Sequence, residues 1–218
     1  MIDTAGIRRK SRIKEDIEYY SIVRTVSAVE RADIVVLVID ATEGITEQDA
    51  KIAGIAHERG KGVIVAVNKW DLIEKTDKTM NEHTKKLKEI LAYMPYAEFL
   101  FISAVSGQRL NKLFDLIDVV IQYHTLRVST GVLNDILAEA VAMQQPPTDK
   151  GRRLKIYYIT QVSVKPPTFI VFVNSKKLMH YSYTRYIENK IREAFGFTGT
   201  PLRFIIRERS ADDTTKIH

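Results

Sequence analysis

Apolar residues in the first half of the chain follow two patterns, short continuous runs and longer stretches with a spacing of three or four. The continuous runs are IVVLVID at 34–40, GVIVAV at 62–67 and FLFISA at 99–104. Continuous runs, unlike alternating ones, are typical of strands buried on both faces of a parallel sheet. We therefore predict an open parallel sheet in this part of the chain.

The longer stretches predict the helices that connect these strands. They cover residues 15–31, 46–59, 79–93 and 109–123. The second has Thr46 as a candidate N-cap, Asp49 three residues later, and Gly60 as a stop at its C-terminal end. Strand and helix alternate, and this order predicts an α/β fold with helices on both faces of the sheet.

The pattern changes near residue 125. Helices are predicted at 131–144, 176–179 and 183–195, and strands at 154–164, 168–174 and 202–207. The resulting order, α-β-β-α-α-β, is that of a small α+β domain with its own core. We therefore divide the chain into residues 1–126, residues 127–210 and a polar tail at 211–218.

Composition excludes several classes of protein. The chain has 218 residues, of which 45% are hydrophobic and 28% charged, as in ordinary globular proteins. No run of about 18 apolar residues is present, so no membrane span is expected. The N-terminus, MIDTAGIRRK, has no apolar segment and is not a signal peptide. The absence of cysteine excludes disulfides and fits a reducing cytoplasm.

The net charge of +6 is unevenly distributed. Residues 1–128 contain 19 basic and 19 acidic side chains, whereas the remaining 90 residues contain 14 and 8. Such asymmetry indicates that the C-terminal part meets a polyanion. A basic surface that contacts only solvent is an equal alternative.

Three short motifs follow the predicted strands or precede the first of them. They are DTAG at 3–6, NKWD at 68–71 and SA at 103–104. Ligands of open α/β sheets bind beyond the carboxyl ends of the strands, where all three motifs are expected. Each motif alone is weak evidence, but chance does not readily explain the three together and in this order.

The last two motifs have the groups that guanine recognition needs. The Asp71 carboxylate can accept two hydrogen bonds from N1–H and the 2-amino group of guanine, a donor pair that adenine lacks. Asn68 can tie the two loops together, and Lys69 can lay its stem across the base. In the SA motif, which includes Ser103, the backbone N–H of Ala104 can donate to the guanine 6-oxo group.

The DTAG motif has groups suited to the phosphate end of a nucleotide. Asp3 is a hard oxygen ligand for Mg²⁺, bound through water. Gly6 lets a backbone N–H approach a terminal phosphate closely. Ile7, which follows Gly6, has a hydrophobic side chain that cannot act as acid or base, and we assign it no catalytic role.

A wider resemblance now becomes specific. The segments DTAGIRRK, ATEGITEQDAKIAG and VNKWDL resemble the second GTPase domain of the bacterial double-GTPase family Der (EngA). The last 90 residues are similar to that family's KH-like domain in length, element order and basic balance. The resemblance implies a partial GTPase domain at 1–126 and a KH-like domain at 127–210. It also implies GTP or GDP with Mg²⁺ as ligands, GTP hydrolysis in the complete domain, and cytoplasmic assembly of the large ribosomal subunit on ribosomal RNA.

One departure from the family pattern limits the expected activity. The sequence contains no GxxxxGK(S/T), the P-loop whose backbone and lysine cradle phosphates and which normally precedes DxxG. We therefore expect an incomplete sheet, in which strand 34–40 lacks a neighbour, and a fragment without its own hydrolysis. As this fragment alone, the chain is alternatively a non-enzymatic RNA- or ribosome-binding module.

The RNA contact of the C-terminal part also differs from the common KH pattern. KH domains clamp nucleotide backbone with a GXXG loop, whereas HYSY at 180–183 has no glycine. The densest basic cluster comprises Lys150, Arg152, Arg153 and Lys155. These side chains can contact phosphates instead, and an equal alternative is that they form a solvated hairpin edge.

Other side chains receive plainer interpretations. Four aromatic residues are predicted to lie in the core or on a sheet face rather than to stack on bases; they are Tyr157, Tyr158, Phe169 and Phe172. Trp70 is predicted to pack either under the base or against a neighbouring helix. The five histidines show no metal-ligand spacing.

Overall fold

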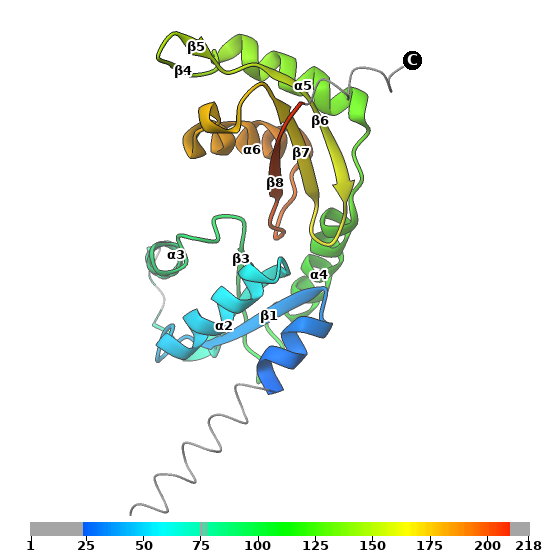
Figure 1. Ribbon diagram of the computed structural model, residues 1–218. Helices are drawn as coiled ribbons and strands as arrows, with labels where there is room; N and C mark the ends of the chain where they lie inside the picture. The colour runs from blue at the N-terminus through cyan, green and yellow to red at the C-terminus, as the bar shows by residue number, and fades with distance from the viewer. Residues whose placement is uncertain (1–23, 75, 77, 210–218) are drawn as a thin grey trace, which may run out of the picture.

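The computed structural model describes residues 24–74, 76 and 78–209 (Figure 1). The DTAG motif lies outside these residues, as does most of the helix predicted at 15–31, of which residues 24–31 are helical. Three parallel strands form the first sheet in the order β1 (Ile34–Asp40), β2 (Gly62–Asn68), β3 (Glu98–Phe101). All three predicted strands are thus confirmed.

The central strand β2 is buried along six of its seven residues, as its uninterrupted apolar sequence predicts. One of its faces, formed by Val63, Val65 and Val67, belongs to a core shared with α2 (Glu47–Glu58) and α3 (Thr79–Ile90). The strand also contacts α4 (Leu110–Thr125). β1 lies at one edge of the sheet, and Val38 in its middle is 57% exposed.

Local signals set the ends of these helices. Thr46 is the N-cap of α2 and forms the predicted capping box with Asp49, and Gly60 follows the helix with φ +72°. α3 ends at Ile90, three residues before the prediction. Pro95 disfavours a helical conformation for Met94, which explains the earlier end.

The C-terminal part has the predicted order with one addition. Its elements are α5 (Thr130–Met143), β6 (Ile156–Ser163), β7 (Thr168–Val173), the 3₁₀ helix η2 (Lys176–Leu178), α6 (Tyr181–Phe195) and β8 (Arg203–Glu208). β6 and β7 are antiparallel, and β7 and β8 are parallel. The addition is a two-residue hairpin of β4 (Thr148–Asp149) and β5 (Arg152–Arg153).

Each part has its own hydrophobic core. The second core lies between the β6–β7–β8 sheet and helices α5 and α6, and Ile159, Phe169 and Phe197 are fully buried in it. The two cores lie on either side of the expected division at residue 126. Among the described residues no helix is both long and apolar enough to cross a membrane.

The loop between α6 and β8 joins the two parts. The backbone N–H of Val63, in β2, donates to the Gly199 carbonyl at 2.8 Å, and the Gly199 N–H donates to the Tyr96 carbonyl at 3.1 Å. His124, 1% exposed at the end of α4, shares a hydrogen bond of 2.6 Å between its Nδ1 and Thr200 Oγ1. The central strand of the first sheet is therefore hydrogen-bonded directly to the C-terminal part.

Candidate functional site

The carboxyl ends of the three parallel strands bring the second and third motifs together. Asp40 ends β1 and is paired in register with Asn68, which ends β2. Beyond β3, Asn68 Oδ1 accepts a hydrogen bond of 2.9 Å from the Ala104 N–H. The two loops expected to contact a base are thus neighbours, and the Asn68 side chain ties them together as predicted.

This hydrogen bond uses the backbone N–H of Ala104, for which we predicted a different acceptor. The Ala104 N–H was expected to donate to a guanine 6-oxo group, but it donates to Asn68 in this structure. A base oxygen at this place would have to share the N–H or displace Asn68 from it. The two predicted roles, loop tie and base donor, therefore compete for one hydrogen atom.

Ser103 holds the loop that presents Ala104. It is fully buried, its N–H donates to the Gln108 carbonyl at 3.2 Å, and its Oγ accepts from the Ser106 N–H at 3.2 Å. Ala104 and Val105, between these anchors, are exposed. Ser103 thus shapes the loop from beneath, and its neighbours are the residues open to a ligand.

Lys69 is held by a carboxylate that the sequence did not assign to the site. Its ammonium is 2.5 Å from Asp40 Oδ2, and its backbone is left-handed with φ +61°. Hydrogen bonds from Lys69 and then Thr42 lower the pKa of Asp40 to about 2, and the bond to Asp40 raises the pKa of Lys69. The Lys69 stem can lie across a base only if its ammonium leaves this partner or the base approaches beside the pair.

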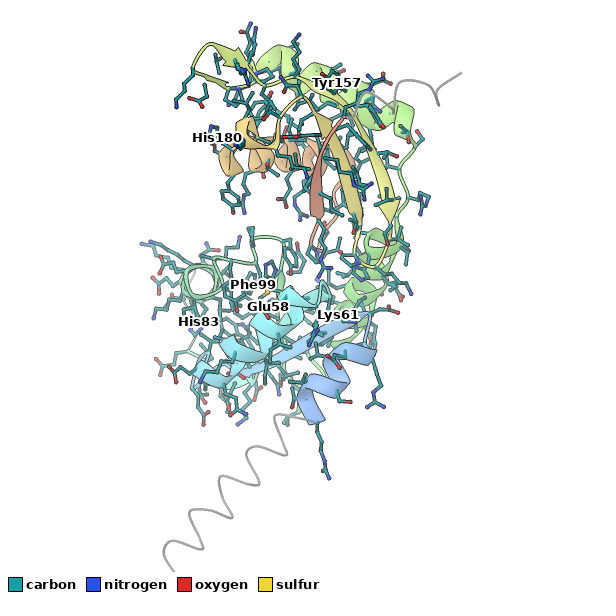
Figure 2. The ribbon with its side chains drawn as sticks, in the orientation of Figure 1. Glu58, Lys61, His83, Phe99, Tyr157 and His180 are labelled. Atoms are coloured by element: carbon teal, nitrogen blue, oxygen red, sulfur yellow. The ribbon has the colours of Figure 1, made fainter. Side chains whose placement is uncertain are left out.

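Burial of Trp70 explains how Asp71 is presented. Trp70 is 2% exposed and packs against Phe101 and His83, with ring centroids 4.3 and 5.2 Å apart. His83 lies on α3 and is labelled in Figure 2, so Trp70 packs against a neighbouring helix, one of its two predicted places. The buried ring anchors the 3₁₀ helix Trp70–Leu72, in which the Asp71 side chain is exposed.

The phosphate end of the expected site is not part of the described structure. Asp3 and Gly6 lie outside the described residues. Within the described ranges no group of three histidine or acidic side chains could hold a metal ion. The calls on Asp3 and Gly6 therefore stay predictions, and the described residues include only those expected at the base end of the site.

The predicted basic cluster lies on the β4–β5 hairpin and the residues that follow it. Lys150 and Gly151 have φ of +47° and +77°, which is the two-residue turn that tight hairpins favour. Arg152 pairs in register with Asp149, and the Arg153 guanidinium donates to Gln145. All four predicted cations are exposed, Lys155 included, so the hairpin offers positive charge to solvent or to a polyanion.

The four aromatic residues considered in the sequence have separate places in the second sheet. Phe169 is in the core, and Tyr158 and Phe172 stack on each other with centroids 4.3 Å apart. Tyr157 is 44% exposed, with the Arg209 guanidinium 5.4 Å from its ring centroid. All four lie on β6 or β7, which confirms the prediction of core or sheet-face positions for them.

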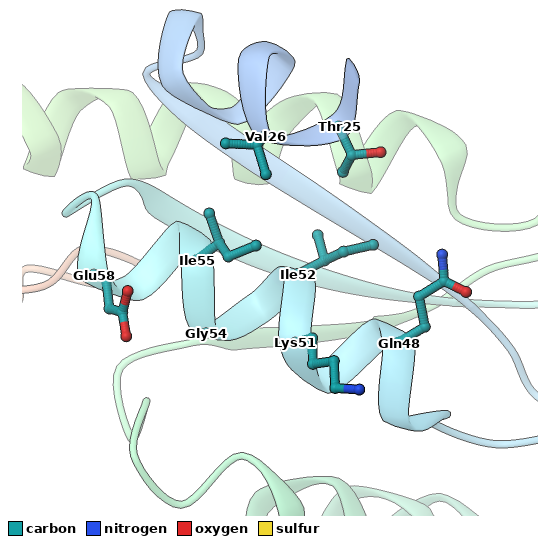
Figure 3. A pocket seen from close by; sticks show the side chains of 8 residues that line it. All are labelled: Thr25, Val26, Gln48, Lys51, Ile52, Gly54, Ile55 and Glu58. Carbon is teal, nitrogen blue, oxygen red and sulfur yellow. The ribbon is translucent and has the colours of Figure 1, made fainter. Parts of the chain in front are cut away.

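The cavity in Figure 3 contains none of the predicted site residues. It has a volume of about 440 Å³ and lies between helix 24–31 and α2. Val26, Ile52 and Ile55 give it an apolar lining. We assign no ligand to it.

Comparison with known proteins agrees with the geometry in both parts of the chain. Residues 18–123 match the family model of the elongation factor Tu GTP binding domain. Residues 127–207 match the model of the C-terminal KH-domain-like part of EngA bacterial GTPase enzymes. The chain is similar at 18% identity and a TM-score of 0.39 to an Aquifex aeolicus Era variant bound to GDP.AlF4-, over 88% of this chain and 70% of that one.

Similarity to curated relatives is much higher. The chain is 73% identical to GTPase Der of Agathobacter rectalis and 72% identical to GTPase Der of Lachnoclostridium phytofermentans, each over 212 residues. Both comparisons cover 97% of this chain and 48% of the relative, so the chain spans about half the length of the curated relatives it matches. With a partial GTP-binding sheet followed by the family's own C-terminal KH-like domain, the chain belongs to the Der (EngA) family of bacterial GTPases.

Proposed function

We propose that this chain is part of a GTP-binding protein of large-ribosomal-subunit assembly, a GTPase in its complete form, that works in the cytoplasm. The observation that supports the nucleotide role most directly is the hydrogen bond between Asn68 and Ala104. It places the NKWD and SA motifs at one edge of a parallel sheet, where ligands of such sheets bind. Family membership supports the ribosomal role.

In this proposal the exposed carboxylate of Asp71 reads the base. It accepts from N1–H and the 2-amino group of guanine, and a base without that donor pair leaves the carboxylate unmatched. Ala104 takes part in the base site through its N–H, which the base oxygen shares with Asn68 or takes from it. Asp3 would hold Mg²⁺ through water, and Gly6 would approach the terminal phosphate, both by resemblance to the family.

Isothermal titration calorimetry of GDP against the 218-residue chain and against the full-length protein tests the nucleotide role. We expect the full-length protein to bind GDP and the 218-residue chain to bind it far more weakly, because phosphate contacts dominate nucleotide positioning. GTP hydrolysis by the 218-residue chain should equal the blank. A full-length protein that fails to bind GDP would refute the nucleotide role.

The KH-like domain supplies the second half of the proposal, docking onto ribosomal RNA. Its supporting feature is the exposed basic hairpin, since all of the chain's net positive charge lies in residues 129–218. Binding through such charges weakens steeply with added salt because counterions are released from the RNA. This contact needs no hydrolysis, so a non-enzymatic RNA-binding role is the second candidate for the 218-residue chain alone.

A salt titration of ribosomal RNA binding tests the docking role. The double variant Arg152→Glu/Arg153→Glu should lower affinity and flatten the salt dependence. The matched control is Lys85→Glu/Lys86→Glu, which reverses two neighbouring exposed charges on α3. Equal affinities for the two double variants, or binding that is independent of salt, would show that the hairpin faces only solvent.

A further inference from the structure

A cavity of about 170 Å³ lies where the two parts of the chain meet. Four segments line it: the end of α2, the loop before β3, the first two turns of α6 and the residues before β8. The lining residues that matter below are His57, Tyr93, Tyr96, Tyr181, Arg185 and Glu188. Because both domains contribute, neither domain alone contains this cavity.

One wall is aromatic and held in place by hydrogen bonds. The Tyr93 hydroxyl donates to the Ala50 carbonyl at 2.9 Å, which fixes the ring against α2. His57 and Tyr96 stack with centroids 5.8 Å apart, and His57 Nδ1 lies 3.0 Å from the Tyr96 hydroxyl. Burial lowers the pKa of His57 and raises that of Tyr96, so this wall is uncharged near neutral pH.

The wall formed by α6 has an exposed ring with a cation over it, because the Arg185 guanidinium carbon lies 5.9 Å from the centroid of the Tyr181 ring. Tyr181 is 76% exposed at the start of α6, and its hydroxyl accepts a hydrogen bond of 3.3 Å from the Arg185 guanidinium. Across the described ranges no carboxylate lies within 4.0 Å of Arg185. Glu188 in the same cavity is paired at 2.9 Å with Arg192. Arg185 thus contacts Tyr181 but has no carboxylate partner among the described residues, whereas Glu188 already has a cationic partner.

We propose that this cavity binds one unstacked base of single-stranded RNA, with the base against Tyr181 and an adjacent phosphate against Arg185. Single-stranded RNA is recognised by aromatic rings that stack on its bases and by cations that follow its phosphates. The volume supports one ring system, since pockets for whole drug-sized ligands span about 300 to 1,000 Å³. The inference rests on the RNA-docking half of the proposed function.

The position of Tyr181 gives this contact a chemical basis different from the glycine clamp of common KH domains. Residues 180–183 are the segment in which a GXXG loop was sought, and His180, labelled in Figure 2, is the N-cap of α6. A tyrosine at this place offers a stacking surface where the common motif offers backbone. The basic hairpin and the cavity are then two distinct RNA contacts, one through charge and one through stacking.

Fluorescence anisotropy with a labelled short oligoadenylate tests the proposal on the 218-residue chain. Tyr181→Ala should weaken binding about tenfold, within the range found for the loss of one stacked base. Tyr181→Phe retains the ring and should bind almost as tightly as the unmodified chain. Arg185→Gln should weaken binding, and the slope of log affinity against log salt concentration should become smaller by about one. Tyr157→Ala removes another exposed tyrosine, outside the cavity, and should leave affinity unchanged.

Equal affinity of Tyr181→Ala and the unmodified chain would overturn the cavity as a base site while leaving RNA docking through the hairpin intact. Equal losses for Tyr181→Ala and Tyr181→Phe would overturn stacking as its basis. No binding of the oligoadenylate by the unmodified chain would overturn this inference alone if ribosomal RNA still binds in the salt titration, and would overturn the docking half as well only if ribosomal RNA also fails to bind. Duplex RNA, whose bases are paired and stacked, should be insensitive to Tyr181→Ala.

Discussion

The side-chain oxygen of Asn68 accepts the backbone N–H of Ala104 at 2.9 Å, which joins two loops separated by 36 residues in the sequence. A main-chain hydrogen bond also joins these loops, because the Trp70 N–H donates to the Ile102 carbonyl at 3.0 Å. The Asn68 side chain extends this link to Ala104, which lies beyond the end of β3 at Phe101.

Asn68→Ala should lower the free energy of unfolding by about 1 kcal/mol, the usual net value of one such hydrogen bond. Urea denaturation measures this change. Asn81→Ala, on the exposed surface of α3, is the matched control and should change stability by less than about 0.5 kcal/mol. If the two variants are equally stable, the tie contributes nothing to the folded state.

Asp71→Asn in the full-length protein should shift preference from guanine toward xanthine nucleotides. The amide donates where the carboxylate accepted, which suits the 2-oxo group of xanthine, and GDP affinity should fall by about 2 kcal/mol or more. Competition of XDP and GDP for a fluorescent nucleotide measures the shift. Unchanged GDP affinity would mean that Asp71 does not contact the base.

Gly199→Ala should destabilise the chain by more than about 1 kcal/mol. Gly199 has φ +68°, and an added Cβ would lie 2.3 Å from Val120 Cγ2, while its carbonyl must stay bonded to Val63. Gly131→Ala is the matched control in α5, where a Cβ meets nothing within 4 Å and the helix favours alanine. The midpoint of thermal unfolding should fall for Gly199→Ala and rise for Gly131→Ala. An unchanged midpoint for Gly199→Ala would show that the junction is loosely packed.

Stability should depend on pH through His124. Burial lowers its pKa from 6.5 to about 4, so between these values the unfolded chain takes up a proton that the folded chain does not. The free energy of unfolding should therefore fall as pH falls from 6.5 to 4, and His124 alone contributes no more than about 1.4 kcal/mol per pH unit. His57, whose pKa burial also lowers, contributes in the same direction.

Urea denaturation of His124→Gln at several pH values separates the two histidines. Glutamine can still form a hydrogen bond with Thr200 but does not titrate. The free energy of unfolding should therefore change less steeply with pH in this variant, but should still change. A slope identical to that of the unmodified chain would place the proton uptake elsewhere.

Residues 127–218 should fold without the first domain. The buried members of the second core all lie between Val128 and Phe197, which are within this segment. Its urea unfolding should be a single cooperative transition, at lower stability than in the whole chain because the contacts of Gly199 and Thr200 are lost. A gradual, non-cooperative transition would show that this core depends on the first domain.

Patterns local in sequence predicted the elements well. The run GVIVAV indicated a strand buried on both faces, and Thr46 with Asp49 indicated the start of α2, because periodicity and capping depend on neighbours in the chain. The pairing of Lys69 with Asp40 could not be predicted in this way. It depends on the register of β1 and β2, which a single sequence does not give.

The contacts between domains were also beyond the sequence. Gly199 and Thr200 lie in a short loop whose residue types are those of an ordinary turn. They nevertheless form hydrogen bonds with Val63 and His124, which are distant in the sequence. Tyr181 likewise could not be assigned to the same cavity as Tyr93, because only the packed domains create that cavity. Such features depend on how whole domains meet.

One consequence follows from the two ends of β2. Its first residues are bonded to the KH-like domain at Gly199, and its last residue, Asn68, is bonded to the loop at Ala104. A fully packed strand resists bending. A small tilt of β2 at its Asn68 end would therefore rotate the attached KH-like domain. The β4–β5 hairpin, at the far end of that domain, would move the greatest distance.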